Sequence, residues 1–193
     1  MKVGILAGGL GTRLAEETEL RPKPMVEIGG LPILWHIMRY YEQFGFTDFA
    51  VALGYKGDYI KRWFVDHANV THDITVDFAR REVIPHGETA ESPWRVDLIE
   101  TGQDTATGGR IKRVREYVGD DTFCLTYGDG LADVSIDELV AFHRREGRKA
   151  TLTGVQPPGR YGALEIEGNE VVRFQEKPQG DGAWINGGFF VLE

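Results

Sequence analysis

The chain contains a single cysteine among its 193 residues, and it has no long apolar run. One cysteine excludes an internal disulfide, which fits a reducing compartment. No stretch approaches the ~18 consecutive apolar residues of a membrane-spanning helix, and the apolar opening from Val3 to Leu6 is far too short for a signal peptide. The expected location is therefore the cytoplasm, with no membrane partner.

Positive charge is also scarce. The chain has 22 Lys and Arg residues and 30 Asp and Glu residues, which gives a formal net charge of −8. Nucleic-acid binders depend on a basic surface that neutralises phosphates, so this composition argues against such a partner. A small phosphorylated ligand remains possible, because a few cations and backbone N–H groups can hold one inside an acidic protein.

Two kinds of catalytic arrangement are missing as well. The five histidines share no metal-ligand spacing, and none has an evident nucleophile partner. A Cys/His metal cluster and a Ser-His or Cys-His pair are therefore not expected. His36 and His143 fall in segments predicted to be helical, where structural or solvent-facing roles are expected. Cys124 lies in an apolar run and is expected to be a buried strand thiol.

Hydrophobic periodicity predicts strands that alternate with helices. This order indicates an α/β fold with a Rossmann-like mixed, mainly parallel sheet flanked by helices. Helices are predicted after Pro32, from Asp58 as an N-cap, after Gly109, and from the capping box that begins at Ser135. Strands are predicted at residues 3–6, 49–53, 74–78, 96–99, 123–127, 150–155 and 189–192.

Residues 1–193 are expected to form one domain, because no internal repeat or linker interrupts the pattern. Residues 163–166 and 171–174 read as a hairpin, whereas the polar stretch 80–93 holds two prolines and is predicted to be a loop. The chain stops inside an apolar strand pattern, which predicts truncation at the C-terminus.

The first chemical signal is a glycine-rich segment after the first predicted strand. Glycines let the backbone approach a ligand and present N–H groups to phosphate oxygens. Arg13 can bind phosphate in its forked geometry, and Lys23 supplies a compact charge between two prolines. Together they would bind a triphosphate and stabilise charge as pyrophosphate leaves. The segment comprises Leu6, Ala7, Gly8, Gly9, Leu10, Gly11, Thr12 and Arg13.

Simpler interpretations of this segment exist. A glycine-rich turn can be only a tight connection, and a lone lysine is usually a solvated surface residue. The segment is not a P-loop, because no Gly-Lys-Ser/Thr follows. It is also a poor dinucleotide fingerprint, because Leu14 stands where glycine or alanine is wanted. The combined element is more specific than any of its parts.

The second signal is Asp129, between Gly128 and Gly130 at the end of an apolar strand pattern. The carboxyl end of a strand is where α/β proteins bind ligands. One oxygen of Asp129 could hold Mg²⁺ while phosphates and water complete the octahedron. The alternative is an ordinary Asp-Gly turn.

Two further segments carry polar groups. Glu176 could accept hydrogen bonds from sugar hydroxyls while Lys177 faces a sugar phosphate, although a Glu-Lys pair at a strand end is more often a solvated edge. The stretch from Thr101 to Arg110 joins a strand to a helix, so its hydroxyls and N–H groups could contact a nucleotide base. The alternative there is a helix entry with a threonine cap.

In combination, these motifs resemble a known family. The stretch from Leu6 to Pro24 is similar to the signature of sugar-1-phosphate nucleotidyltransferases, and three shorter motifs follow in the family's order. Within that family, the Thr-Gly-Gly-Arg and Pro-Pro-Gly-Arg segments look most like the branch that uses CTP and glucose 1-phosphate. The three shorter motifs are Gly128-Asp129-Gly130, Glu176-Lys177-Pro178 and Asn186-Gly187-Gly188.

The resemblance implies a Mg²⁺-dependent cytidylyltransferase of sugar-nucleotide and polysaccharide biosynthesis. In such an enzyme, a sugar phosphate oxygen attacks the α-phosphorus of CTP, giving CDP-glucose and pyrophosphate without a general base. It also implies a homo-oligomer. Arg13, Lys23 and Asp129 would then be catalytic, with Asp129 as the metal ligand. The nucleotide would contact residues 6–13, Lys23, Thr105, Arg110 and Gly128, and the sugar phosphate would contact Glu176, Lys177 and Asn186.

Family members usually continue beyond this length, and a later strand supplies a second Asp to the metal. The expected metal set within this sequence is therefore Asp129 with phosphates and water. Two other functions remain open from the residues: the same reaction with another nucleotide such as UTP or dTTP, and a non-catalytic nucleotide-binding module. A dehydrogenase is the weakest alternative.

Overall fold

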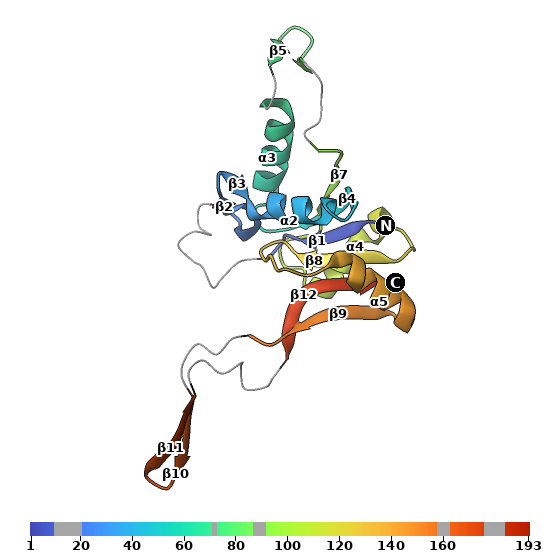
Figure 1. The fold of residues 1–193 in the computed structure, drawn as a ribbon. Helices are drawn as coiled ribbons and strands as arrows, with labels where there is room; N and C mark the ends of the chain where they lie inside the picture. The colour runs from blue at the N-terminus through green and yellow to red at the C-terminus, as the bar shows by residue number, and fades with distance from the viewer. Residues whose placement is uncertain (10–20, 71–72, 87–91, 158–162, 176–183) are drawn as a thin grey trace.

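A computed structural model describes residues 1–9, 21–70, 73–86, 92–157, 163–175 and 184–193. At its centre is a six-stranded sheet in the order β7-β4-β1-β8-β12-β9 (Figure 1). The first four strands in this order are mutually parallel, and β12 runs antiparallel to β8 and β9. The predicted mixed, mainly parallel sheet is confirmed. Its strands are β1 (Val3–Leu6), β4 (Asp48–Leu53), β7 (Arg95–Glu100), β8 (Phe123–Tyr127), β9 (Ala150–Val155) and β12 (Ile185–Leu192).

The predicted helices are present, with two corrected starts. Ser135 caps α5 by accepting a hydrogen bond from the Glu138 N–H at 3.3 Å, as the capping box predicted. The prediction that Asp58 is an N-cap was wrong, because α3 already begins at Gly57. Similarly, α4 begins at Thr107, ahead of Gly109. The helices are α2 (Ile33–Glu42), α3 (Gly57–Val70), α4 (Thr107–Val118) and α5 (Ile136–Glu146).

Two hydrophobic layers enclose the sheet. On one face, α2 and α5 pack through residues such as Ile37 and Val140 against strand side chains. Tyr41 of α2 lies almost parallel to Phe189 of β12, with ring centroids 6.2 Å apart. On the other face, Val114 of α4 packs against the alternate side chains of β4 and β8. Because each fully buried large apolar side chain contributes about 1.5–3 kcal/mol, these layers hold the ends of the strands firmly in place.

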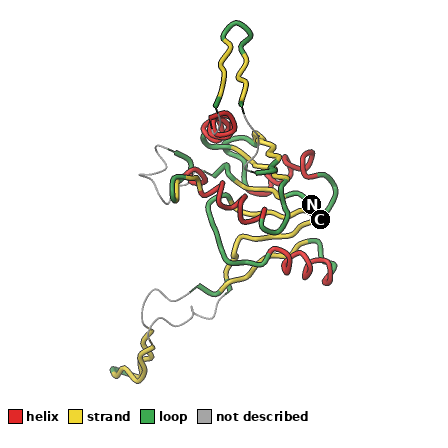
Figure 2. The backbone as a smooth tube through the Cα atoms, turned by 45° about the horizontal axis from the view of Figure 1, so that its top comes forward, coloured by secondary structure: helices red, strands yellow, loops and turns green. Residues whose placement is uncertain are grey.

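Two hairpins extend from the body in opposite directions (Figures 1 and 2). One joins β5 (Ile74–Asp77) to β6 (Glu82–Pro85), so the prediction of a loop across residues 80–93 was wrong for β6. The other joins β10 (Ala163–Glu167) to β11 (Glu170–Gln175), and it confirms the predicted hairpin. None of the helices in the described ranges is long and apolar enough to cross a membrane.

Candidate nucleotide-binding and active site

The strand order places a crevice beside β1. The chain runs outward from β1 to β4 and β7, and it then returns to β8 on the other side of β1. In open α/β sheets, ligands bind at the carboxyl ends of the strands where the strand order reverses in this way. Gly8 and Gly9 follow β1 at this point, and Asp129 follows β8.

A cavity of about 510 Å³ lies there, a volume typical of small-molecule sites. It is bounded by the loop after β1, the segment around Lys23, the loop after β7, and the end of β8. The lining residues are Leu6, Ala7, Gly8, Gly9, Lys23, Pro24, Gln103, Asp104, Thr105, Ala106, Thr107, Arg110, Tyr127 and Asp129.

The structure brings together most of the predicted site residues that it describes. Gly128 is buried directly behind the cavity, where its N–H donates to the Leu6 carbonyl at 3.0 Å. Asn186 does not line the cavity, but its amide nitrogen lies 3.2 Å from the hydroxyl of Tyr127, which does. Predicted residues that line the cavity are Leu6, Ala7, Gly8, Gly9, Lys23, Thr105, Arg110 and Asp129. Predicted residues outside the described ranges are Leu10, Gly11, Thr12, Arg13, Glu176 and Lys177.

Lys23 stands on a short, stiff support. It begins the 3₁₀ turn η1 (Lys23–Met25), and the flanking Pro22 and Pro24 restrict the backbone. The Met25 N–H donates to the Pro22 carbonyl at 2.8 Å, and the Met25 side chain is buried in the core. Within the described part of the chain, Lys23 forms no ion pair, so its ammonium group remains available to an anion in the cavity.

Arg110 occupies the floor of the cavity and is only 6% exposed. One terminal nitrogen, Nη1, donates to the Leu53 carbonyl at 2.9 Å, the Thr101 hydroxyl at 2.7 Å and the Gly102 carbonyl at 2.8 Å. The other, Nη2, donates to the carbonyls of Gly8 and Gln103, both at 2.9 Å. Burial lowers the pKa of Arg110, and the nearby Arg113 guanidinium lowers it further. A guanidinium nevertheless keeps its proton in proteins, so the floor is cationic.

The loop after β7 ends in a helix that has no side-chain cap. Ala106 is the N-cap of α4 and cannot accept a hydrogen bond through its side chain, so the alternative of a threonine cap is wrong. The Thr105 hydroxyl instead accepts from Arg113 Nη1 at 3.0 Å. The first N–H groups of α4 therefore stay free of a side-chain cap beside the cavity, which is a favourable environment for an anion.

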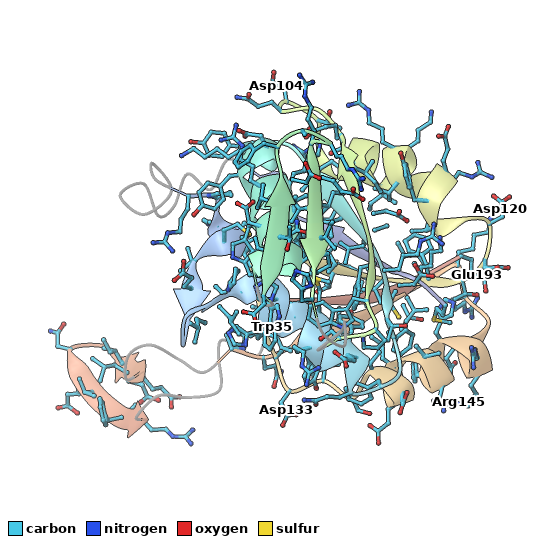
Figure 3. All side chains as sticks on the ribbon, turned by 90° about the horizontal axis from the view of Figure 1, so that it is seen from above. Trp35, Asp104, Asp120, Asp133, Arg145 and Glu193 are labelled. Atoms are coloured by element: carbon cyan, nitrogen blue, oxygen red, sulfur yellow. The ribbon has the colours of Figure 1, made fainter. Side chains whose placement is uncertain are left out.

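Asp129 is the exposed carboxylate that follows β8 at the cavity. Among the described residues it forms no ion pair, and no cluster of three or more His, Cys, Asp or Glu side chains could hold a metal there. Asp104 also lines the cavity but lies at the outer edge of the molecule (Figure 3). A single hard oxygen donor fits Mg²⁺ that receives its other ligands from phosphates and water.

Sequence reasoning assigned no role to Tyr127, although it lines the cavity. The Asn186 side-chain carbonyl accepts from the Gly188 N–H at 2.8 Å, which orients its amide nitrogen toward the Tyr127 hydroxyl at 3.2 Å. Tyr127 therefore accepts from Asn186, and because its hydroxyl donates to none of the described residues, its O–H can donate to a ligand. The signal in the sequence was its place directly before Gly128-Asp129, at the end of a buried strand.

His36 and His143 do not line the cavity. His143 is buried on α5, and its Nδ1 lies 2.8 Å from the Thr151 hydroxyl. His36 Nε2 lies 2.8 Å from the Ile28 carbonyl. Cys124 is fully buried in β8, as expected.

Comparison with known proteins shows the family. The pattern of the nucleotidyl transferase family matches residues 2–193. The chain belongs to this family. This nucleotidyl transferase is 56% identical to the glucose-1-phosphate cytidylyltransferase of Salmonella typhi, across the whole chain and 75% of that protein. It is 45% identical to the probable glucose-1-phosphate cytidylyltransferase of Bacillus subtilis, across the whole chain and 74% of that protein.

Solved structures share the fold of this chain. The nucleotidyl transferase matches HddC from Yersinia pseudotuberculosis with a TM-score of 0.67 and 28% identity, over 100% of this chain and 76% of that one. It also matches a UDP-glucose pyrophosphorylase complexed with UDP-glucose, with a TM-score of 0.62 over 99% of this chain and 75% of that one. The identity there is 16%, so this likeness concerns the fold alone.

Proposed function

We propose that this nucleotidyl transferase is a Mg²⁺-dependent glucose-1-phosphate cytidylyltransferase, which makes CDP-glucose and pyrophosphate from CTP and glucose 1-phosphate. The observation that carries the proposal is the 56% identity, over the whole chain, to a protein of that activity. The cavity supports it independently, because its cations and free N–H groups suit a triphosphate.

In this proposal, the nucleotide lies along the loop after β1. The Gly9 backbone lines the cavity, and a Cβ added at Gly9 would meet none of the described residues within 4 Å, so the phosphates can come close to the chain. Lys23 faces them from η1, and the uncapped start of α4 adds partial positive charge. The predicted contacts of Leu10, Gly11, Thr12 and Arg13 extend this phosphate site.

The reaction then needs positioning and charge neutralisation rather than a protein nucleophile. The phosphate oxygen of glucose 1-phosphate, already ionised at neutral pH, attacks the α-phosphorus of CTP. The bond to the β-phosphate oxygen breaks, and pyrophosphate departs with the electron pair. Lys23 stabilises the charge that develops on the phosphates. Asp129 would hold Mg²⁺, which when bound neutralises phosphate charge.

The sugar phosphate is expected on the side of β12. Asn186 and Tyr127 connect that side to the cavity through their hydrogen bond of 3.2 Å. The free O–H of Tyr127 can donate to a phosphate or hydroxyl oxygen that enters between the two halves of the site. Glu176 and Lys177 remain the predicted partners of the sugar and of its phosphate.

The test of the proposal is pyrophosphate release by the purified chain with Mg²⁺ and glucose 1-phosphate, measured separately with CTP, UTP, dTTP, ATP and GTP. We expect release mainly with CTP. Release mainly with UTP or dTTP would keep the reaction class and overturn the choice of donor. Tight CTP binding by calorimetry without any release would instead support a nucleotide-binding module.

The metal assignment has its own test. Asp129→Asn keeps the size of the side chain and removes its charge, so Mg²⁺-dependent turnover should fall by roughly 10²-fold or more. Asp133→Asn is the matched control, because Asp133 is exposed in the same segment and does not line the cavity. Equal turnover in the two variants would remove Asp129 from the metal site.

A further inference from the structure

We propose that Arg110 is a positioning residue that fixes the distance between two opposite walls of the cavity. It acts through the backbone of both walls. One wall is the loop after β1, and the other is the loop after β7. The identity of the nucleotide rests on the proposed function, whereas the role of Arg110 as a brace does not.

The hydrogen bonds of Arg110 leave no terminal N–H without a protein acceptor. Its two terminal nitrogens carry four hydrogens. They meet five acceptors, from Gly8, Leu53, Thr101, Gly102 and Gln103. A terminal N–H that donates to a ligand would have to break one of these bonds. All the acceptors of the terminal nitrogens of Arg110 are therefore protein atoms.

Nη2 is the atom that connects the two walls. It lies 2.9 Å from the Gly8 carbonyl and 2.9 Å from the Gln103 carbonyl, and both residues line the cavity. These two carbonyls belong to segments that are far apart in the sequence. Their separation across the cavity is thus set by one planar group, whose fork has a fixed geometry.

Two glycines make room for the guanidinium. A Cβ added at Gly8 would lie 2.3 Å from Arg110 Nη1, and one added at Gly54 would lie 2.4 Å from the same atom. Real Cβ contacts do not come this close, so any side chain at either position would displace the group. Gly54 does not itself line the cavity, so Gly54→Ala would displace Arg110 without adding an atom to a cavity-lining residue, although its Cβ would also lie 2.7 Å from the Gly8 carbonyl oxygen.

A second arginine steadies the same loop one turn farther along α4. Arg113 Nη1 donates to the Thr101 carbonyl and to the Thr105 hydroxyl. Gly109 gives Thr105 its space, because a Cβ there would lie 2.7 Å from the Thr105 methyl group. The loop after β7 is thus held by hydrogen bonds from the helix that follows it, and Arg110 also bonds to Gly8 in the loop after β1.

A lysine cannot take over this role. Its hydrogens diverge from one nitrogen, so it cannot reach acceptors on both sides of a planar fork, although it keeps the charge. No carboxylate is among the acceptors of Arg110, so the positive charge is not neutralised locally. Arg110→Lys therefore separates the two possible roles: it preserves attraction for an anion and removes the brace.

The experiment compares Arg110→Lys, Arg110→Met and Gly54→Ala with Arg115→Met. Arg115 is the control on the same helix, because it pairs with Asp120 at the surface. We would measure Kd for CTP with Mg²⁺ by calorimetry, kcat and KM, and amide hydrogen exchange across residues 101–107 without nucleotide. All three test variants should lose about 10²-fold in kcat/KM and exchange faster in that loop. The control should match the unmodified protein.

Specific results would overturn the proposal. Recovery of affinity and turnover in Arg110→Lys would show that charge, and not the fork, is what matters. Unchanged exchange across residues 101–107 in Gly54→Ala would show that the loop does not depend on Arg110. The fraction of folded protein is measured by thermal unfolding, and each affinity is calculated for that fraction. A variant that has lost its fold is thereby distinguished from one that has lost only the positioning of the loop. If the unmodified protein does not use CTP, the proposed function fails, while the exchange result still tests the brace.

Discussion

Neighbouring glycines in the loop after β1 should respond in opposite ways to the addition of a methyl group. Gly8→Ala places a Cβ 2.3 Å from Arg110 Nη1, 2.6 Å from its Cζ and 2.9 Å from the Gly54 backbone nitrogen. Gly9→Ala places a Cβ that meets no atom within 4 Å in the part of the chain that the structure describes. We therefore expect Gly8→Ala to destabilise the fold and Gly9→Ala to leave it intact.

The size of the effect follows from the hydrogen bonds at Arg110. The added methyl group must push the guanidinium away from its acceptors. The methyl group cannot itself move away from the guanidinium, because the Gly54 backbone nitrogen lies 2.9 Å from it. A hydrogen bond to a charged group contributes about 1.5–3 kcal/mol, and an underpaired buried charge costs more. We expect a loss of about 3 kcal/mol in the free energy of unfolding, which corresponds to a fall of roughly 6–12 °C in Tm.

For Gly9→Ala, the unfolded chain loses conformational freedom, and in the folded chain the added methyl group contacts none of the described residues. The free energy of unfolding should stay unchanged or rise by about 0.4–1 kcal/mol. Nucleotide affinity should nevertheless fall, because Gly9 lines the cavity and a methyl group there keeps phosphates away from the backbone N–H groups.

The assay is thermal and urea unfolding of both variants without nucleotide, followed by calorimetry with CTP and Mg²⁺. A Gly8→Ala variant whose Tm lies within about 2 °C of the unmodified protein would refute the reasoning, because it would mean that Arg110 is free to move. Equal destabilisation by both substitutions would refute it too, because the loop as a whole would then be intolerant of side chains.

Three further predictions concern single side chains. Lys23→Ala should lower kcat/KM by ~10²–10³ without lowering Tm, and normal kinetics would rule out its role in charge stabilisation. Tyr127→Phe should raise KM for glucose 1-phosphate about tenfold while KM for CTP stays constant, as steady-state kinetics can check; equal changes in both would place the hydroxyl elsewhere. Burial raises the pKa of the Cys124 thiol from its usual 9.0 to about 12. The unfolded chain therefore loses this proton first, and stability should fall as pH rises from 9 to 12, by at most about 1.4 kcal/mol per pH unit. Urea unfolding at several pH values between 9 and 10 gives the slope of the free energy of unfolding against pH. This slope should be smaller in Cys124→Ala than in the unmodified protein, and an identical slope would contradict the burial argument.

The elements that could be predicted are those whose evidence is local. The helix α5 shows this, since the hydrogen bond from Glu138 to Ser135 spans only a few residues and the apolar spacing repeats along one face. The strand β6 shows the opposite. It is short, exposed and contains Pro85, and its pairing with β5 supplies the order that its own sequence does not indicate.

The start of α4 was missed for a related reason. Gly108 and Gly109 weaken the local helical signal, because glycine is a poor helix former. The structure nevertheless includes both in the helix, where Gly109 makes space for Thr105. A tertiary contact outweighed intrinsic propensity at this end of the helix.

The sequence by itself determined the class of the protein and the chemical groups of its site. Short stretches of sequence are enough to recognise the strand and helix periodicities, the glycine-rich loop and Asp129, because backbone preference and side-chain chemistry are local properties. The hydrogen-bond partners of Arg110 were decided only by the tertiary structure. Its acceptors at Gly8 and Leu53 lie 102 and 57 residues away. No local sequence pattern indicates contacts between residues so far apart. They form only because packing of the sheet and α4 brings three strand ends to one guanidinium.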